Sequence, residues 1–157
     1  MMAKPVLVGV ARQTAMKTYQ VVLDTNVLVA AARSKRGASY ALLRTLPKRT
    51  WQMCISPALL LEYESQLKIE AMRQNRPLGI VDRFLDYLLS VSNRRQVYFL
   101  LRPFLPDAND DFVIELAVAA QVQFIVTHNV RDFAGAEEYG VRVLTPLEFL
   151  RMVERES

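Results

Sequence analysis

The sequence predicts an α/β fold, a three-layer α/β/α sandwich around a mainly parallel five-stranded sheet. Short apolar runs alternate with segments of helical periodicity in the order β-α-α-β-α-α-β-α-β-β-α, as expected when helices connect parallel strands. At 157 residues, 52% of them hydrophobic, the chain suits one domain with a single core. We expect this domain over 19–157 and interpret 1–18 as an N-terminal extension, a candidate for disorder in which Met16 is an alternative start of translation.

The first strand is predicted at 19–23, because this segment ends in a continuous apolar run. Such a run is typical of a strand that is buried on both faces of a sheet. A helix is expected from about 27 to 33, followed by a basic turn at 34–37. A second helix then continues to Leu46, where Pro47 ends it.

The second strand is predicted at 51–55. The helix after it has clear starting signals, since Ser56 is a natural N-cap and Pro57 fits the first helical position. We expect this helix to continue to about Arg73, before a break at 74–77.

An amphipathic helix follows the break, because apolar residues recur there at helical spacing. They are Ile80, Phe84, Tyr87, Leu88 and Val91. Arg94 and Arg95 are expected to close this helix, where their charges complement its dipole. The third strand is then predicted at 97–101.

The last part of the chain predicts two helices and two strands. A nearly all-apolar helix is expected at 110–121, and such a helix is largely buried. Strands are predicted at 124–127 and 141–144. Pro146 starts a terminal amphipathic helix.

Composition limits the classes of function. The formal charge of +4 and the pI of about 9.4 permit a polyanionic partner. One cysteine, Cys54, and one histidine, His128, allow neither an internal disulfide nor a Cys/His zinc site, so we expect a cytoplasmic protein. The run 5–11 faintly resembles a secretory signal, but Arg12 ends it early. The five glycines form no phosphate-binding loop.

Asp24 stands at the predicted carboxyl end of the first strand, where open α/β sheets bind their ligands. The alternative is that Asp24 only caps the next helix. Thr25 and Asn26 are suited to turn the chain and cap that helix.

Two further stretches carry acids. Glu62 lies on the helix after the second strand, with Glu64 as a solvated competitor. Asp107, Asp110 and Asp111 lie at the start of the helix before the fourth strand. Carboxylates gathered at one edge of a sheet repel each other, and a divalent cation is the usual remedy. Oxygen ligands favour Mg²⁺ or Mn²⁺, which can activate water for phosphodiester hydrolysis without a protein nucleophile.

Together with Val126-Thr127-His128-Asn129-Val130-Arg131-Asp132-Phe133, these motifs resemble the PIN domain, a family of metal-dependent nucleases. The greatest likeness is to the PIN ribonuclease toxins of bacterial toxin–antitoxin pairs, and it covers roughly 21–150. The resemblance implies a PIN-like fold, hydrolysis of single-stranded RNA and a small antitoxin as partner. It is compatible with a homodimer, and it leaves the acceptance of DNA and the number of metal ions open.

The resemblance also implies roles for individual acids. Asp24 matches the first acid of the family and Glu62 the second, both as metal ligands. The third is ambiguous, and the spacing to Ala117 selects Asp110, with Asp107 as a helix cap.

The fourth position departs from the family, because Asn129 stands where many members have Asp. Asp132 is interpreted as its replacement, with Asn129 in support. Thr127 is a candidate for orienting a metal-bound water, or a plain β-branched strand residue. Lys35 and Arg36 are the candidate RNA contacts, with solvated surface charge as the alternative.

Two other functions remain in view. One is a catalytically weak PIN-fold module that binds RNA or protein, which the missing fourth acid would favour. The other is a receiver-like phosphate-accepting domain, which would need a second Asp beside Asp24 or two residues after it.

Overall fold

A computed structural model describes residues 18–46, 50–97 and 108–156, with side chains from Asp111 onward in the last segment. Its centre is a five-stranded sheet in the order β3-β2-β1-β4-β5, and every neighbouring pair is parallel. The strands are β1 Tyr19–Leu23, β2 Trp51–Ile55, β3 Asn93–Arg94, β4 Phe124–Val126 and β5 Arg142–Leu144. The predicted fold class is confirmed.

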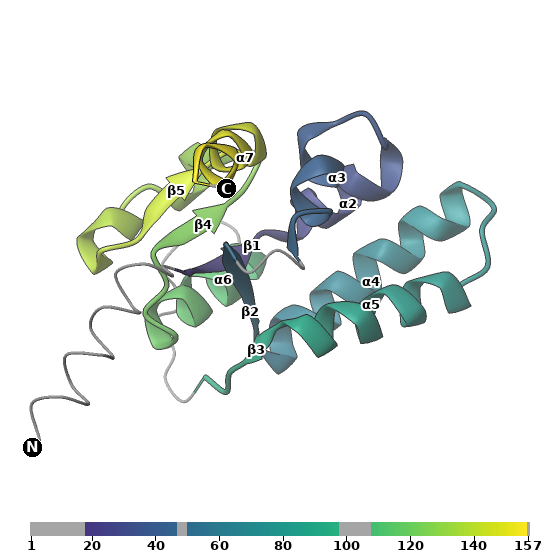
Figure 1. Cartoon of the computed structure of the whole chain (residues 1–157). Helices are drawn as coiled ribbons and strands as arrows, with labels where there is room; N and C mark the ends of the chain where they lie inside the picture. Colours follow the sequence, from purple (N-terminus) through teal and green to yellow (C-terminus); the bar gives the residue numbers. More distant parts are fainter. Residues whose placement is uncertain (1–17, 47–49, 98–107, 157) are drawn as a thin grey trace, which may run out of the picture.

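Helices cover both faces of this sheet, and Figure 1 shows α6 and α7 on opposite sides of it. The α-helices are α2 Thr25–Arg33, α3 Ala38–Leu43, α4 Pro57–Arg73, α5 Gly79–Val91, α6 Ala108–Ala119 and α7 Pro146–Arg155. Two 3-10 helices, η2 Val130–Phe133 and η3 Ala136–Tyr139, connect β4 to β5. None of the described helices is long and apolar enough to cross a membrane.

The core forms where the apolar runs of the sequence meet. Val21, Val22 and Leu23 of the central strand are fully buried, as expected for a strand with neighbours on both faces. On one face, Phe149 of α7 contacts the rings of Trp51 and Phe124 at centroid distances of 5.5 and 5.4 Å. These aromatic contacts fix α7 across three strands of the sheet.

The helix starts follow the predicted signals. The Ser56 hydroxyl accepts a hydrogen bond from the Leu59 amide at 3.2 Å and caps α4. Thr145 and Glu148 form a reciprocal capping box at the start of α7, with Pro146 at the first position. α2 begins at Thr25, two residues before its predicted start.

The third strand differs from its prediction. β3 is the pair Asn93–Arg94, so Arg94 belongs to a strand and does not close α5, which ends at Val91. The Arg95 amide donates to the Ile55 carbonyl at 2.9 Å and extends this short ladder. Val97 is not in a strand, and 98–101 lie outside the described residues.

Two helix ends also differ from their predictions. α6 ends at Ala119 because Gln121 turns into the left-handed region at φ 53°, and the Val122 amide bonds back to the Ala117 carbonyl at 3.1 Å. α3 ends at Leu43, before the predicted stop at Pro47, which lies outside the described residues.

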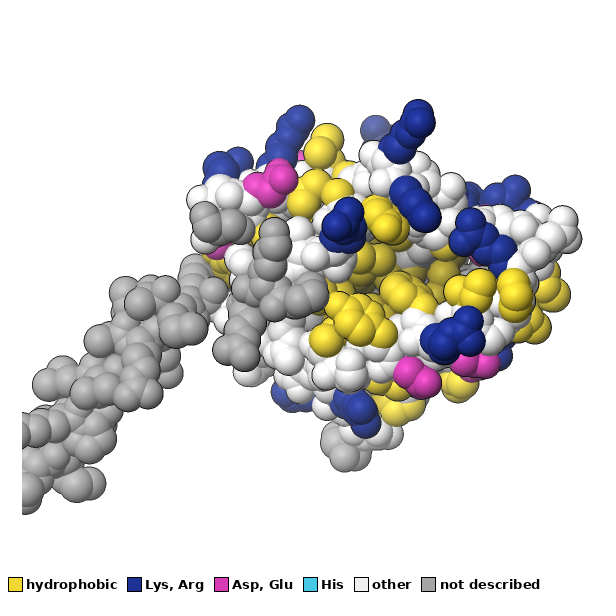
Figure 2. Space-filling view, turned by 45° about the vertical axis from the view of Figure 1, so that its right-hand side comes forward, with side chains coloured by type: hydrophobic (Ala, Val, Ile, Leu, Met, Phe, Trp, Pro, Cys, Tyr) yellow, Lys and Arg dark blue, Asp and Glu magenta, His cyan; other side chains and the backbone are white. Residues whose placement is uncertain are grey.

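A cavity of about 600 Å³ opens between the α2–α3 pair and the α4–α5 pair. Its walls are mostly apolar side chains from these four helices, including Leu28, Leu43, Leu67, Ile80, Phe84 and Tyr87. Lys35, Arg44 and Arg76 also line it. Figure 2 shows hydrophobic side chains in this hollow with Lys and Arg side chains around it. We call this feature the helical groove.

Candidate active site

Asp24 and Thr127 meet at the carboxyl edge of the sheet. β1 and β4 pair with Leu23 opposite Val126, so the next residue of each strand lies beside its counterpart. The Asp24 amide donates to the Val126 carbonyl at 2.9 Å, and the Thr127 amide donates to the Leu144 carbonyl at 2.9 Å. Backbone ladders therefore carry both side chains to the place where parallel sheets bind ligands.

The Asp24 carboxylate is buried, with 7% of the residue exposed, and Thr127 is fully buried. The Thr127 hydroxyl donates to Asp24 Oδ2 at 2.7 Å. Asp24 is the N-cap residue of α2, yet its side chain makes no capping hydrogen bond. The side chain of Asp24 therefore does not make the hydrogen bond expected of a residue that only caps the helix. Its carboxylate contacts Thr127, directly after β4, instead.

The bonding capacity of the Thr127 hydroxyl is fully used. Besides donating to Asp24, its oxygen accepts from the Asn129 amide at 3.0 Å and from Asn26 Nδ2 at 3.4 Å. A hydroxyl has one donor and two acceptor positions, so all three are occupied. Thr127 thus holds Asp24 in place, and orienting a water as well would require one of these bonds to open.

Asn26 also supports this edge of the sheet. Its Nδ2 donates to Thr127, and its Oδ1 accepts from the His128 amide at 3.3 Å. The side chain spans from the first turn of α2 to the loop after β4. Asn26 therefore joins the first turn of α2 to Thr127 and to the loop that follows it.

Glu62 lies on α4, next to a residue that is bonded to the end of β1. Its neighbour Tyr63 is fully buried and donates its hydroxyl to the Leu23 carbonyl at 2.5 Å, one residue before Asp24. Burial, and secondarily the negative charge of Asp24, raise the pKa of Tyr63 well above its ordinary value, so the phenol stays a neutral donor. Tyr63 thereby fixes the start of α4, with the half-buried Glu62, against the end of β1.

Glu64, the competitor of Glu62, has a different environment. Its carboxylate pairs with Lys68 at 2.8 Å, and Lys68 also contacts Asp82 of α5 at 3.3 Å. Glu64 therefore belongs to a surface ion-pair network between two helices.

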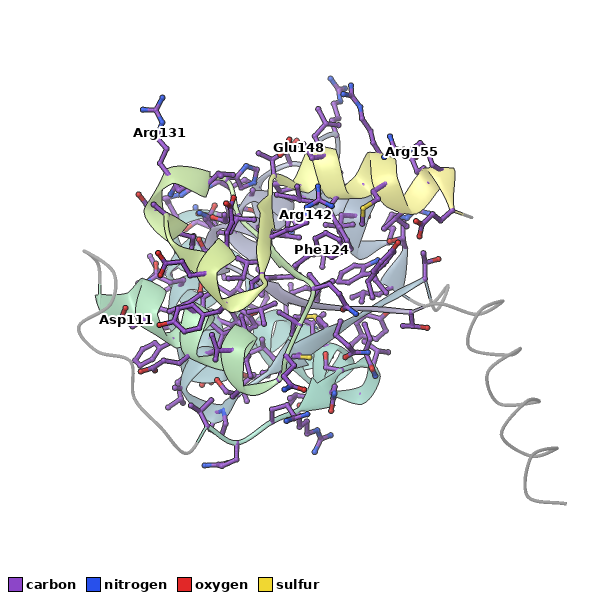
Figure 3. All side chains as sticks on the ribbon, turned by 90° about the vertical axis from the view of Figure 1, so that its left-hand side faces the viewer. Asp111, Phe124, Arg131, Arg142, Glu148 and Arg155 are labelled. Carbon is purple, nitrogen blue, oxygen red and sulfur yellow. The ribbon has the colours of Figure 1, made fainter. Side chains whose placement is uncertain are left out.

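The acids of α6 are only partly described. Asp107 lies outside the described residues, and Asp110 lies in the first turn of α6 with its side chain outside them. Asp111 is 1% exposed and Glu115 is 3% exposed, on a helix that packs against β1 and α4. Figure 3 shows Asp111 at the start of α6. The two acids are four residues apart and share one helix face.

Glu115 was not selected from the sequence. The available signal was a single acid inside an otherwise apolar helical run, and its burial depends on packing that the run does not reveal. Among residues with described side chains, no three acidic, histidine or cysteine groups form a ready metal cluster. The side chains of Asp107 and Asp110 are outside that set.

The fourth position lies just after β4. Asn129 donates its amide to Thr127, while Asp132 is exposed on η2 with its amide bonded to the Asn129 carbonyl at 3.0 Å. Arg131 points away from the fold in Figure 3. Asp132 therefore lies at the solvent side of the loop that holds Thr127, and Asn129 is tied directly to it.

The candidate RNA contacts lie in the turn between α2 and α3. Lys35 and Arg36 are both exposed, and the Arg36 amide donates to the Ser34 hydroxyl at 3.2 Å. Lys35 also lines the helical groove. The structure thus leaves both cations accessible to a polyanion.

Comparisons with known proteins agree with this architecture. A family model described as PIN domain matches residues 20–131. The fold is similar to the crystal structure of VapBC2 from Rickettsia felis bound to a DNA fragment from its promoter. The TM-score is 0.55 at 18% identity, and the match covers 80% of this chain and 98% of that chain. A search of curated proteins gives no significant match.

Proposed function

The chain belongs to the PIN domain family of nucleases, and from this premise we propose that it hydrolyses single-stranded RNA with the help of Mg²⁺ or Mn²⁺. The observation that carries the proposal is Asp24, a buried carboxylate held by Thr127 at the carboxyl edge of a parallel sheet. A plain helix cap does not need this arrangement, whereas a metal ligand benefits from a fixed orientation.

The residues at this edge suit a hard divalent cation, because the side chains assigned as ligands offer oxygen atoms. Asp24, Glu62 and an acid at the start of α6 would hold the ion, with Asp132 as the fourth acid and Asn129 in support. The bound ion would supply Lewis acidity toward the phosphodiester and its attacking water. Thr127 holds Asp24, Tyr63 bonds α4 to the end of β1, and Lys35 with Arg36 would bind flanking phosphates.

For the α6 acid, the sequence selects Asp110, and the structure adds a reason to consider Asp111. Asp111 is almost completely buried on a helix that packs against β1, the strand directly before Asp24. We therefore propose Asp111 as the ligand from this helix, with Asp110 as the competing assignment.

The alternative is a PIN-fold module that binds RNA or protein without turnover. Asn129 favours it, because an amide in place of an acid brings no charge to the site. Cleavage of single-stranded RNA by the purified protein, with Mg²⁺ or Mn²⁺ and with chelator, distinguishes the two. We expect cleavage with metal, none with chelator, and none from Asp24→Asn. Full cleavage in excess chelator would contradict the proposal, and RNA binding without cleavage would favour the alternative.

We also propose that a small antitoxin is the partner and that one of its helices occupies the helical groove. The VapBC2 neighbour, a toxin–antitoxin complex, supports the class of partner. The groove is apolar inside and has Lys35, Arg44 and Arg76 among its lining residues, which complements an amphipathic helix with acidic flanks.

Two exposed isoleucines give a matched test of this docking site. Ile80 lines the groove and is 39% exposed, whereas Ile69 lies outside the groove lining and is 52% exposed. We expect Ile80→Glu to weaken binding of the proposed antitoxin at least tenfold, and Ile69→Glu to leave it unchanged. Equal binding by both variants would place the partner elsewhere.

A further inference from the structure

His128, the single histidine of the chain, is bonded to α3. Its Nε2 lies 2.9 Å from the Ser39 hydroxyl oxygen, a hydrogen-bond distance. Ser39 is 2% exposed in the first turn of α3, whereas His128 is exposed in the loop after β4. The contact therefore joins a buried side chain of one element to an exposed ring of another.

The backbone of the same histidine is hydrogen-bonded toward Asp24. We call the carboxyl edge of the sheet, with Asp24 and the other proposed metal ligands, the acidic edge. The His128 amide donates to Asn26 Oδ1 at 3.3 Å, and Asn26 Nδ2 donates to Thr127. Thr127 in turn donates to Asp24. A continuous series of hydrogen bonds therefore runs from α3 through His128 to the buried carboxylate.

The element at the other end of this series is the basic turn 34–37. α3 begins at Ala38, directly after the turn, and has only six residues. Its N-cap residue, Gly37, offers no side-chain cap. Such a short helix holds its position by tertiary contacts, because an isolated helix of this length is not stable. Ser39 supplies one such contact, at the end of α3 that adjoins Lys35 and Arg36.

We propose that Ser39 and His128 are positioning residues that hold the basic turn at a fixed separation from Asp24. An RNA strand then meets Lys35 and Arg36 at the same time as its scissile phosphate reaches the acids. This inference rests on the proposed ribonuclease function. It assigns neither residue to the chemical step, so their loss affects substrate affinity and leaves turnover at saturation intact.

The single imidazole makes the contact directly observable. In a ¹⁵N-labelled protein, the ring nitrogens of His128 give the only histidine side-chain signals, and their shifts report which nitrogen carries the proton. We expect Ser39→Ala to shift the Nε2 signal. The control is Ser90→Ala, since the exposed Ser90 hydroxyl donates to the Tyr87 carbonyl at 2.6 Å on the distant helix α5. It should leave the imidazole signals unchanged.

The functional readout separates positioning from catalysis. We expect Ser39→Ala to raise KM for single-stranded RNA at least fivefold with kcat within twofold, and to weaken RNA binding in chelator by a similar factor. His128→Ala should act alike, whereas His128→Gln, which keeps a hydrogen-bonding side chain, should recover part of the affinity. A fall in kcat at constant KM would overturn the positioning role.

The imidazole signals and the RNA measurements also distinguish a failure of this inference from a failure of the proposed ribonuclease function. An unchanged imidazole spectrum in Ser39→Ala rejects the contact, whether or not the protein cleaves RNA. Absence of RNA cleavage by the wild type rejects the proposed function instead. A shifted spectrum with unchanged RNA affinity rejects the positioning role alone.

Discussion

At the scale of single residues, the Thr127 hydroxyl holds the buried Asp24 carboxylate at the carboxyl edge of the sheet. An acid after a continuous apolar run predicts a carboxylate at the carboxyl edge of a sheet, and the structure has it there. The bond from Thr127, 103 residues away, depends on the register of β1 with β4, which no local pattern encodes. The burial of Glu115 was missed for the same reason, because it follows from how α6 packs.

Tyr63 gives the first prediction at this scale. Tyr63→Phe removes the hydroxyl that bonds the Leu23 carbonyl and keeps the buried ring. We expect the start of α4 to lose its fixed distance from Asp24, so Mn²⁺ affinity falls about tenfold, equivalent to about 1.4 kcal/mol. Titration with Mn²⁺ followed by electron paramagnetic resonance measures it. Tyr87→Phe, at an exposed tyrosine of α5, is the control. Equal Mn²⁺ affinity in wild type and Tyr63→Phe would mean that α4 is held without this bond.

The acids of α6 give the second prediction. If burial against β1 identifies the ligand, Asp111→Asn should reduce RNA cleavage by several orders of magnitude, since a lost ligand removes several kcal/mol of transition-state stabilisation. Asp107→Asn, at the position that the sequence predicts to be a helix cap, should cost at most about 1 kcal/mol of stability. Initial cleavage rates at saturating Mn²⁺ measure the difference. An inactive Asp110→Asn beside an active Asp111→Asn would restore the assignment made from the sequence.

At the scale of elements, patterns with strong periodicity predicted well and short edge elements did not. Ser56 and Pro57 located the start of α4 because capping is a local property. β3 has only Asn93 and Arg94, two polar residues without a strand pattern, and pairs because the end of β2 offers a free edge. The third strand was predicted at 97–101 because that stretch is apolar. Periodicity in the sequence does not show where hydrogen bonding between two strands begins.

Glu70 joins two helices and gives a prediction about pH. Its buried carboxylate bonds Arg33 of α2 at 2.9 Å, Arg73 at 2.9 Å and Gln74 at 2.6 Å. Hydrogen bonds, first from Arg73 and then from Gln74, lower the pKa of Glu70 to about 2, despite its burial. A carboxyl whose folded pKa is depressed stabilises the fold above its unfolded value and loses that contribution as pH falls toward the folded value.

We therefore expect Glu70→Gln to lower the free energy of unfolding at pH 7 by about 1.5–3 kcal/mol, the range for hydrogen bonds to charged groups. The deficit relative to wild type should shrink as pH falls from about 4.5 to about 2. Urea unfolding across this range measures it. Glu64→Gln, in a more exposed ion pair, should cost less than about 1 kcal/mol. A deficit that grows with acid would show that the Glu70 charge is not the stabilising feature.

For the whole molecule, the sequence predicted the fold class, a mainly parallel five-stranded sheet between helices, because the alternation of strands and helices admits few other arrangements. The strand order β3-β2-β1-β4-β5 was not predicted. The helical groove was not predicted, since it arises from the separation of two helix pairs that are each amphipathic. The acidic edge also acts at this scale. In the proposed site, an ion held by Asp24, Glu62 and an acid of α6 would link three separate segments of the chain, and it would do so only in the folded state.

The last prediction uses this link between metal and global stability. A ligand that binds only the native state, at a concentration of about 100 times its Kd, stabilises that state by about 2.7 kcal/mol. Saturating Mn²⁺ should therefore raise the wild-type melting temperature by roughly 5–10 °C.

Asp24→Asn keeps the side-chain volume and an oxygen that accepts from Thr127, but it removes one charge from the acidic edge. Without metal, the variant should melt no lower than wild type, because a repelling charge is gone. With Mn²⁺ it should lose most of the increase, while Glu64→Gln, whose wild-type carboxylate pairs with Lys68, should retain it. Thermal melts of the three proteins with chelator and with Mn²⁺ measure both effects. A destabilised Asp24→Asn with a full Mn²⁺ response would mean that Asp24 serves the fold and that the metal binds elsewhere.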